Sequence, residues 1–396
     1  MGFPSFLALH AWYRHGAHRF DDRAKAPPHQ RSKTGRFRRF RHTGRRLTVA
    51  AVAALLTCPA GAETLRIATF SPELTRKGPG LLLRDILRGD DQVDAVVEVI
   101  RAASADVLLL TGMDMDREGA TLAALTDRLS ESGIAYPHSF TTMGNTGLRT
   151  GVDLDGDGRL EEPEDAQGFG RFPGEGSMAV LSRYPLAPVQ ELTDLLWRDL
   201  PGGDPWFASD EAAAVQRLSS VAHWDVRVEA PGGPLHLLAF SATPPVFDGE
   251  EDRNGRRAED ELRVWQVYLD GGLSGPPDGP AVIAGRINVD PVDGEGRRTV
   301  LRAMRSGPLQ DPAPEGPGGM AEADARHNGP PGQDTVDWDG PGNLRVDYVL
   351  PQAGLEVAGA GVLWPVEGQP LNGLSLATAR AASRHRLVWV DLVLDR

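Results

Sequence analysis

A set of acidic residues with regular spacing is the clearest sign of chemistry in this chain. The set lies in segment 153–164 and comprises Asp153, Asp155, Asp157, Glu161 and Glu164. Alternate carboxylates before a turn at Gly158 can converge on one hard cation, and they match positions 1, 3, 5, 9 and 12 of a calcium-binding EF-hand loop. Pro163 and the Gly-rich residues before the set do not predict flanking helices. We expect a calcium-type loop inserted between strands, and the alternative is an acidic turn held in solvent.

Three other polar residues stand in apolar, strand-like segments of the C-terminal half. They are Asn288, Asp347 and His385. An amide donates a hydrogen bond without losing a proton, a carboxylate can bind a metal or orient a histidine, and histidine titrates near pH ~6.5. Taken singly, each could equally cap a turn or stabilise a loop. Only their combination suggests a site.

The order of the strand-like segments resembles that of the endonuclease/exonuclease/phosphatase superfamily over roughly residues 64–396. These segments are Leu65–Phe70, Asp106–Leu110, Ser177–Leu186, Leu235–Phe240, Ala281–Asn288, Asn343–Leu350 and Ala382–Asp391. The resemblance implies an α/β fold in which two mixed β-sheets pack face to face and are covered by helices, a four-layer α/β sandwich. It also implies a phosphoester hydrolase that depends on a divalent metal, Mg²⁺ or Mn²⁺.

The resemblance assigns catalytic roles to the three polar residues. Asn288 matches the amide that contacts the phosphate, and Asp347 matches an acidic residue that binds the metal or pairs with a histidine. His385 matches the terminal histidine, which acts as a general base or as a donor to the transition state.

This sequence departs from the family pattern at five positions. The substituted residues are Ser71 for an Asn, Gly112 for a metal-binding Glu, Ser241 for a His, and Arg286 and Arg384 for Asp. A shifted loop could supply carboxylates instead, so the expected metal ligands are Glu73, Asp114 and Asp347, with Asp116 as a further candidate. The two guanidinium groups would repel a metal but could bind phosphate in a bidentate manner.

Two functional interpretations therefore stay open. The protein is either a divergent hydrolase or a catalytically degraded family member that binds an anion or a partner and is stabilised by calcium. Fold alone does not decide between them.

Helical patterns alternate with the strand-like segments, and no repeat or linker interrupts residues 63–396, so we expect one domain there. Helices are expected at Val93–Ile100 after the capping residues Asp90 and Asp91, at Leu122–Leu129, at Glu259–Leu269 and at Arg297–Arg305. The Gly-rich segments Leu148–Glu175 and Ser306–Gly342 are expected to be loops.

Residues 1–62 form a basic leader and an expected signal peptide. An apolar run, Leu47–Thr57, follows Arg45-Arg46 and precedes a small-residue cleavage pattern ending at Ala62, and it is too short to span a bilayer. We expect export to the periplasm or medium. A translation start downstream of Met1, a twin-arginine signal and lipidation at Cys58 are alternatives. Cys58 is the only cysteine, so the exported part would contain no disulfide.

The rest of the chain is strongly acidic. Residues 63–396 contain 30 Lys and Arg against 53 Asp and Glu, a net charge of −23. DNA-binding proteins need basic surface to displace counterions, so a small phosphoester or another anionic substrate is expected rather than polymeric DNA. We expect a monomer without a membrane-spanning segment.

Overall fold

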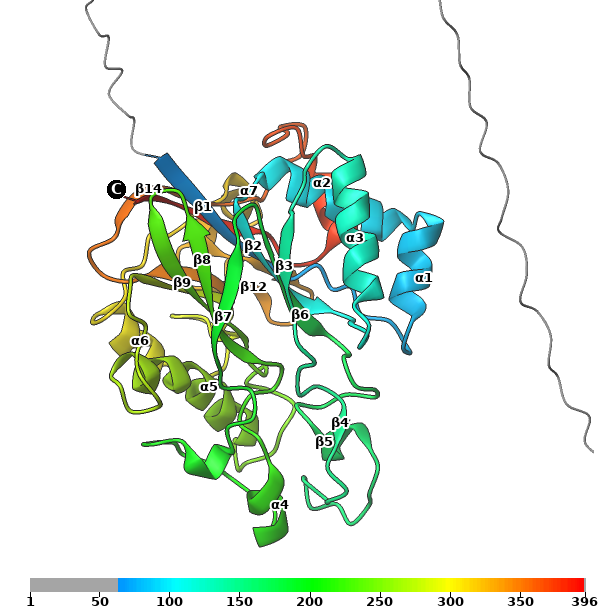
Figure 1. The fold of residues 1–396 in the computed structure, drawn as a ribbon, viewed down its shortest axis with the longest axis vertical. Helices are drawn as coiled ribbons and strands as arrows, with labels where there is room; N and C mark the ends of the chain where they lie inside the picture. The colour runs from blue at the N-terminus through cyan, green and yellow to red at the C-terminus, as the bar shows by residue number, and fades with distance from the viewer. Residues whose placement is uncertain (1–62, 395–396) are drawn as a thin grey trace, which may run out of the picture. The chain divides into compact units, whose positions relative to one another are not determined.

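Two mixed β-sheets lie face to face between two layers of helices (Figure 1). This computed structural model describes residues 63–394. The first sheet has the strand order β14–β15–β1–β2–β6–β3. Its strands are β1 (Glu63–Phe70), β2 (Val107–Met113), β3 (His138–Phe140), β6 (Ser177–Ser182), β14 (Glu356–Val362) and β15 (Val388–Leu394).

The second sheet has the order β13–β10–β9–β8–β7. Its strands are β7 (Leu186–Glu191), β8 (His223–Ala230), β9 (Gly233–Ser241), β10 (Ala281–Arg286) and β13 (Asp347–Pro351). One pair in each sheet is parallel, β1 with β2 and β9 with β10, and the other pairs are antiparallel. The predicted four-layer α/β sandwich is confirmed.

The strands read as continuous apolar runs because both faces of each sheet are buried. Successive side chains in a strand point to opposite faces. In β1, Leu65 and Ile67 join the core between the sheets, whereas Ala68 and Phe70 join the core beneath the outer helices. Trp224 of β8 is fully buried between the sheets, where it packs edge-on against Phe140 of β3.

Helices cover the outer face of each sheet. The first sheet is covered by α1 (Leu81–Arg88), α2 (Asp91–Ala103), α3 (Ala120–Glu131) and α8 (Leu376–Ala382). The second is covered by α5 (Arg253–Leu269) and α6 (Thr299–Arg305). The four expected helices are thus confirmed, and Asp90 caps α2 as expected by accepting hydrogen bonds from the next turn.

Two expected strands are shorter than the apolar patterns suggested. The segment Asn343–Leu350 is divided between β12 (Gly342–Leu344), which pairs with β11 (Val336–Trp338), and β13. In Ala382–Asp391, only residues from Val388 onward are in a strand. The interruptions matter because they place Asp347 and His385 at strand ends rather than within the sheets.

The two expected loops hold little regular structure. Residues 148–175 contain β4 (Leu148–Arg149), a 3-10 turn at Pro163–Asp165 and β5 (Ala166–Gln167). Residues 306–342 contain α7 (Pro317–Ala321), a 3-10 turn at Pro331–Gln333 and β11. The remaining elements are a 3-10 turn at Trp197–Asp199 and α4 (Asp210–Val215).

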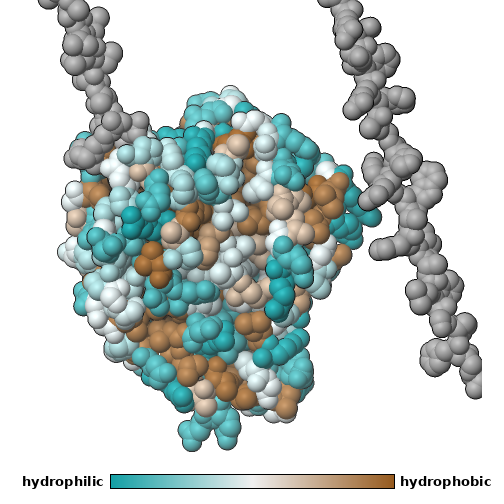
Figure 2. Space-filling model, in the orientation of Figure 1, coloured by the Kyte–Doolittle hydropathy of each residue, from teal (hydrophilic) through white to brown (hydrophobic). Residues whose placement is uncertain are grey.

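The described surface mixes hydrophilic and hydrophobic residues, as the face drawn in Figure 2 shows. Within residues 63–394, no helix is both long and apolar enough to cross a membrane. The expected leader, with Cys58 and the cleavage position, lies outside the described residues.

Candidate functional site

A cleft of about 680 Å³ lies where the parallel strands of both sheets end. Its lining includes Arg286, which ends β10, and Asn288 two residues beyond it. Glu73 follows β1, while Arg384 and His385 precede β15. The carboxyl ends of parallel strands meet at one edge of a sheet, which is the usual place for a binding site in α/β proteins. Residues far apart in the sequence are therefore brought together as the strand order predicts.

His385 and Asp347 form a buried pair behind the cleft. The His385 Nδ1 lies 2.7 Å from Asp347 Oδ2, so a proton on Nδ1 is donated to the carboxylate. Thr335 Oγ1 donates to the same carboxylate oxygen at 3.1 Å, and Trp338 packs edge-on against the imidazole at 5.7 Å between ring centroids. Among the described residues, His385 Nε2 has no hydrogen-bond partner. The pair thus holds an imidazole whose Nε2 can accept a proton at the cleft.

Asn288 is held by its backbone as well as by its side chain. Its φ of 61° is left-handed, a conformation that asparagine tolerates better than most residues. Its Nδ2 donates to the Ala242 carbonyl at 2.6 Å, and its backbone N–H donates to the Val346 carbonyl at 3.2 Å. These bonds fix Asn288 between the ends of β9, β10 and β13, on the lining of the cleft.

Arg286 is a partly buried cation without an ion-pair partner among the described residues. Its one hydrogen bond runs from Nη1 to Ser71 Oγ at 3.3 Å, and Nε is buried without a partner. Burial lowers the pKa of Arg286, although the charges of Asp347 and Glu73 oppose this effect. A buried charge without a close partner is costly, so the protein maintains this group at the expense of stability.

Several buried polar atoms at the same strand ends have no hydrogen-bond partner within the described part of the chain. They are Thr69 Oγ1, Thr111 Oγ1, Ser177 Oγ, Ser241 Oγ, Arg286 Nε and Asp347 Oδ1. Each of these atoms belongs to one of the last three residues of a strand or to its first residue. Unsatisfied buried polar groups are rare in folded proteins, and a cluster of them is a mark of a functional site.

Glu73 and Arg384 form a bidentate ion pair at the side of the cleft. Arg384 donates from Nε at 3.0 Å and from Nη2 to Oε1, while its backbone N–H donates to Oε2 at 2.8 Å. Burial raises the pKa of Glu73, but the hydrogen bonds from Arg384 outweigh it and bring the pKa to about 2. Glu73 is therefore ionised and already neutralised by a guanidinium group.

Asp114 and Asp116 accept hydrogen bonds from the backbone instead of pointing into the cleft. Asp114 accepts from the N–H groups of Arg76 and Gly176 at 2.7 and 3.0 Å, and burial raises its pKa to about 6. Asp116 accepts from the first two residues of α3 and so caps that helix. Neither residue lines the cleft.

The residues present do not fit the divalent metal that the resemblance implies. Within residues 63–394, the only group of at least three potential ligands whose atoms lie within 4.8 Å of one another is elsewhere, so Glu73, Asp114 and Asp347 do not converge. Glu73 is paired with Arg384, and Asp347 with His385. A Cβ at Gly112, whose φ is +67°, would lie 3.2 Å from Ser71 Oγ and 3.9 Å from Arg286 Nη1. Ser71 and Arg286 therefore occupy the space next to the position where the family has its glutamate.

Three residues of this region were missed at the sequence level. Asp290 lines the cleft, but its carboxylate accepts from the N–H groups of its own loop and of Arg345. Trp338 and Thr335 come from the long segment 306–342 that was expected only to be a loop. No residue spacing could have identified them, because their contacts with His385 and Asp347 depend on how this segment folds back.

Asp334 offers a test of electrostatics next to the site. Burial, reinforced by the charge of Asp290, raises the pKa of Asp334 to about 7 from 3.8. Between pH 3.8 and about 7 the folded protein therefore keeps a proton on Asp334 that the unfolded protein has lost. The free energy of unfolding is highest, as far as Asp334 is concerned, below pH 3.8, and it falls as the pH rises to about 7.

We expect Asp334→Asn to raise the free energy of unfolding by at least about 1 kcal/mol at pH 8, and to make no comparable difference below pH 4. Urea unfolding across this range measures the effect. Asp127→Asn, at an exposed position on α3, is the matched control. An equal gain in the two variants, or a gain independent of pH, would contradict the interpretation.

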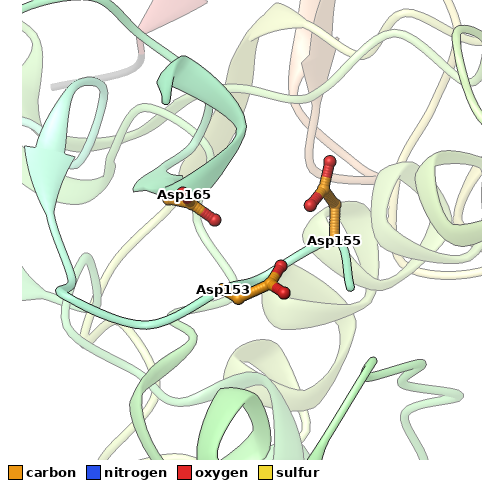
Figure 3. A group of neighbouring side chains, drawn as sticks. All are labelled: Asp153, Asp155 and Asp165. Atoms are coloured by element: carbon orange, nitrogen blue, oxygen red, sulfur yellow. The ribbon is translucent and has the colours of Figure 1, made fainter. Parts of the chain in front are cut away.

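The acidic loop contains three converging carboxylates that could bind a cation, but they are not the five that the sequence predicted. Oxygen atoms of Asp153, Asp155 and Asp165 lie within 4.8 Å of one another (Figure 3). Asp157, Glu161 and Glu164 are not in the group. Asp165 is buried, and its carboxylate accepts from Leu154 N–H at 3.0 Å. Because a 3-10 turn begins at Pro163, it is Asp165 rather than the preceding glutamate that faces Asp153.

Comparison with known proteins identifies a family and several similar solved structures. The endonuclease/exonuclease/phosphatase family model matches residues 76–385. A solved family protein from Beutenbergia cavernae is 21% identical with a TM-score of 0.49, covering 84% of this chain and 72% of that one. A family protein from Leptotrichia buccalis is 14% identical with a TM-score of 0.47, covering 83% and 99%. Sphingomyelinase C from Streptomyces griseocarneus is 16% identical with a TM-score of 0.44, also covering 83% and 99%.

A search of curated proteins finds no match. The family model nevertheless spans most of the chain, including Asn288, Asp347 and His385. This chain belongs to the endonuclease/exonuclease/phosphatase family.

Proposed function

We propose that the protein is an exported hydrolase that acts on a small phosphoester. The observation that supports this most directly is the His385–Asp347 pair, which adjoins the same cleft as Asn288 and Arg286. This arrangement combines a proton acceptor with donors that can hold a phosphate, which are two requirements of phosphoester hydrolysis.

In the proposed reaction, Nε2 of His385 accepts a proton from water while the water oxygen bonds to phosphorus. The bond between phosphorus and the ester oxygen breaks, and the leaving alkoxide takes the proton from the imidazolium, directly or through water. Asp347 stabilises the imidazolium formed in between, because its carboxylate accepts from Nδ1. Asn288 and Arg286 would donate hydrogen bonds to the non-bridging oxygens.

The walls of the cleft favour a small substrate over a polymeric one. Glu295 and Asp339 are exposed at the rim and would repel an extended polyanion. The lining also contains the apolar residues Pro245 and Trp338 and the highly exposed Phe247. A phosphoester with a compact apolar group could place its phosphate against Arg286 and Asn288 and its apolar group against these apolar side chains.

A second candidate function is binding without turnover, to an anionic ligand or partner. It is favoured by a specific observation, namely that Gly112 stands where the resemblance places the metal-binding Glu, while Glu73, the substitute carboxylate, is paired with Arg384. The family is generally dependent on divalent metals. A hydrolysis assay with and without Mg²⁺ or Mn²⁺ measures whether this protein shares that dependence.

The deciding experiment is a hydrolysis assay of the purified protein on phosphomonoester, phosphodiester and DNA substrates. Each substrate is tested in EDTA and with Mg²⁺, Mn²⁺ or Ca²⁺. Release of alcohol or phosphate from a small ester supports the hydrolase. A preference for DNA would contradict the proposed substrate class, and no hydrolysis under any condition would favour the binding function.

We also propose that Ca²⁺ binds the acidic loop and stabilises the fold. Three carboxylates held close together repel one another unless a cation screens them. Ligand linkage gives about 2.7 kcal/mol when free Ca²⁺ is ~100 times the dissociation constant, so the melting temperature should rise with Ca²⁺.

Replacing Asp153 and Asp155 together by alanine should abolish this rise in melting temperature. Glu164→Gln should retain most of it, because Glu164 is outside the group of converging carboxylates. Loss of the rise in Glu164→Gln would instead support the twelve-residue loop expected from the sequence. No rise in the unmodified protein between micromolar and millimolar Ca²⁺ would leave the loop an acidic turn.

A further inference from the structure

We infer that Arg286 and Arg384 take over the electrostatic role of the family's metal, so that this cleft binds a phosphate group without any divalent cation. This inference deepens the proposed function, since it concerns the same cleft. It can nevertheless fail separately, because it concerns binding and not hydrolysis. Three observations support it. Arg286 makes only one side-chain hydrogen bond and no ion pair among the described residues, Glu73 is already paired with Arg384, and Gly112 lies beside the Arg286 guanidinium.

The first argument is the unused donor capacity of Arg286. A guanidinium group has five N–H donors, and this one makes a single hydrogen bond, to Ser71. In the described part of the chain it has no ion pair, yet it lines the cleft. A phosphate can accept two parallel hydrogen bonds from such a group and supply the missing negative charge. An anion therefore removes the electrostatic cost of burying Arg286, whereas a metal cation would increase it.

The second argument is that Glu73, the expected metal ligand that lines the cleft, is not available to a cation. Glu73 accepts from the Arg384 side chain and backbone through both oxygens. A metal would have to displace Arg384 first, while an incoming phosphate can share the exposed guanidinium without breaking the pair.

The third argument is steric and links two of the substitutions. A Cβ at position 112 would lie within 3.9 Å of the Arg286 guanidinium and even closer to Ser71 Oγ. The positive φ of Gly112 adds backbone strain for any other residue. A Cβ alone would only touch the guanidinium, but a carboxylate side chain extending from position 112 would compete with Arg286 for the same space. The absence of a glutamate at position 112 and the presence of an arginine at position 286 are therefore sterically compatible with each other.

The orphaned Nε of Arg286 agrees with an anion, because a guanidinium N–H can only donate. Most of the other orphaned atoms are hydroxyl groups, which can donate to an anion as well as accept. The exception is Asp347 Oδ1, which belongs to the histidine pair.

The test is the binding of inorganic phosphate to the full chain, measured by calorimetry and by thermal unfolding, in EDTA and again with Mn²⁺. We expect the same affinity in both buffers. Arg286→Gln should weaken binding roughly tenfold or more, since hydrogen bonds between charged groups are lost. Arg286→Lys should fall between, because it keeps the charge but loses the planar fork. Arg101→Gln, which alters an exposed helix residue, should bind phosphate like the unmodified protein.

Melting temperatures and circular dichroism in the absence of phosphate show whether each variant is folded. Phosphate binding that requires Mn²⁺, or that is unchanged in folded Arg286→Gln or Arg286→Lys, would overturn the inference. Absence of phosphate binding in both buffers would also overturn it. Hydrolysis that depends on His385 could still be observed in any of these cases, and that result would leave the proposed function standing.

Discussion

Replacing His385 by alanine is expected to lower the rate of phosphoester hydrolysis by roughly 10²–10⁴-fold, the usual contribution of a general base. The reason is that His385 is the group at the cleft whose Nε2 can accept a proton while Nδ1 donates to Asp347. Phosphate affinity should change much less than the rate, because Arg286 rather than the imidazole is expected to hold the anion. Steady-state kinetics together with calorimetry separates the two effects.

Asp347→Asn provides the companion measurement. An amide at this position can present an N–H to Nδ1, which would reverse the tautomer and leave Nε2 protonated. The rate should therefore fall although the histidine is still present. His138→Ala is the matched control, because His138 pairs with Ser182 at the opposite end of the first sheet. An His385→Ala protein that hydrolyses the ester as fast as the unmodified one would remove His385 from the mechanism.

The position of the site was predictable because it depends on strand order. Asn288, Asp347 and His385 follow or precede apolar runs that had to form buried strands, and the ends of these strands meet at one edge. The pairing of Asp347 with His385 was one of two roles left open for that aspartate, and it is the one present in the structure. Apolar periodicity and chain order sufficed for this level of detail.

The directions of individual side chains were not predictable in the same way. Asp114 follows β2 as a shifted metal ligand would, yet two backbone N–H groups compete for its carboxylate. At the acidic loop, Pro163 begins a 3-10 turn, and this local geometry brings Asp165 to Asp153. Both outcomes depend on backbone donors, which a pattern of residue types does not reveal.

The substituted arginines show a third situation, in which the sequence identified the residues but not their partners. Arg384 and Glu73 are 311 positions apart, and their ion pair exists because the start of β15 lies beside the end of β1. Arg286 has no such partner among the described residues. Two similar substitutions thus have different physical consequences, since one arginine neutralises a carboxylate and the other keeps its charge for the cleft.

A metal site should be recoverable if these two arginines are what prevents it. We expect the double variant Arg286→Asp with Arg384→Asp to gain a Mn²⁺-dependent rise in melting temperature that the unmodified protein lacks. The exchange replaces two positive charges with two negative ones and releases Glu73 from its ion pair. Hard carboxylate oxygens are suitable ligands for Mn²⁺. Hydrolysis by the variant should become dependent on Mn²⁺ as well.

The size of the effect follows from the same electrostatics. Without metal, the new carboxylates would lie near Asp347 and Glu73, and their repulsion should make the double variant melt below the unmodified protein in EDTA. Mn²⁺ at ~100 times its dissociation constant would return about 2.7 kcal/mol. Replacing Arg84 and Arg101 by aspartate gives the same change in net charge on exposed helix positions, and this control should show no response to Mn²⁺.

If the double variant does not respond to Mn²⁺, the two arginines are not the main reason why the cleft lacks a metal site. Gly112 would then be the limiting position, because no carboxylate replaces the glutamate expected there. Adding Gly112→Glu is the next step, and removal of the Arg286 side chain provides the space that it needs. The backbone at position 112 would still be strained, at a cost of roughly 1–2 kcal/mol for a left-handed residue other than glycine. A triple variant that binds Mn²⁺ where the double variant does not would show that the glycine and the arginine must change together.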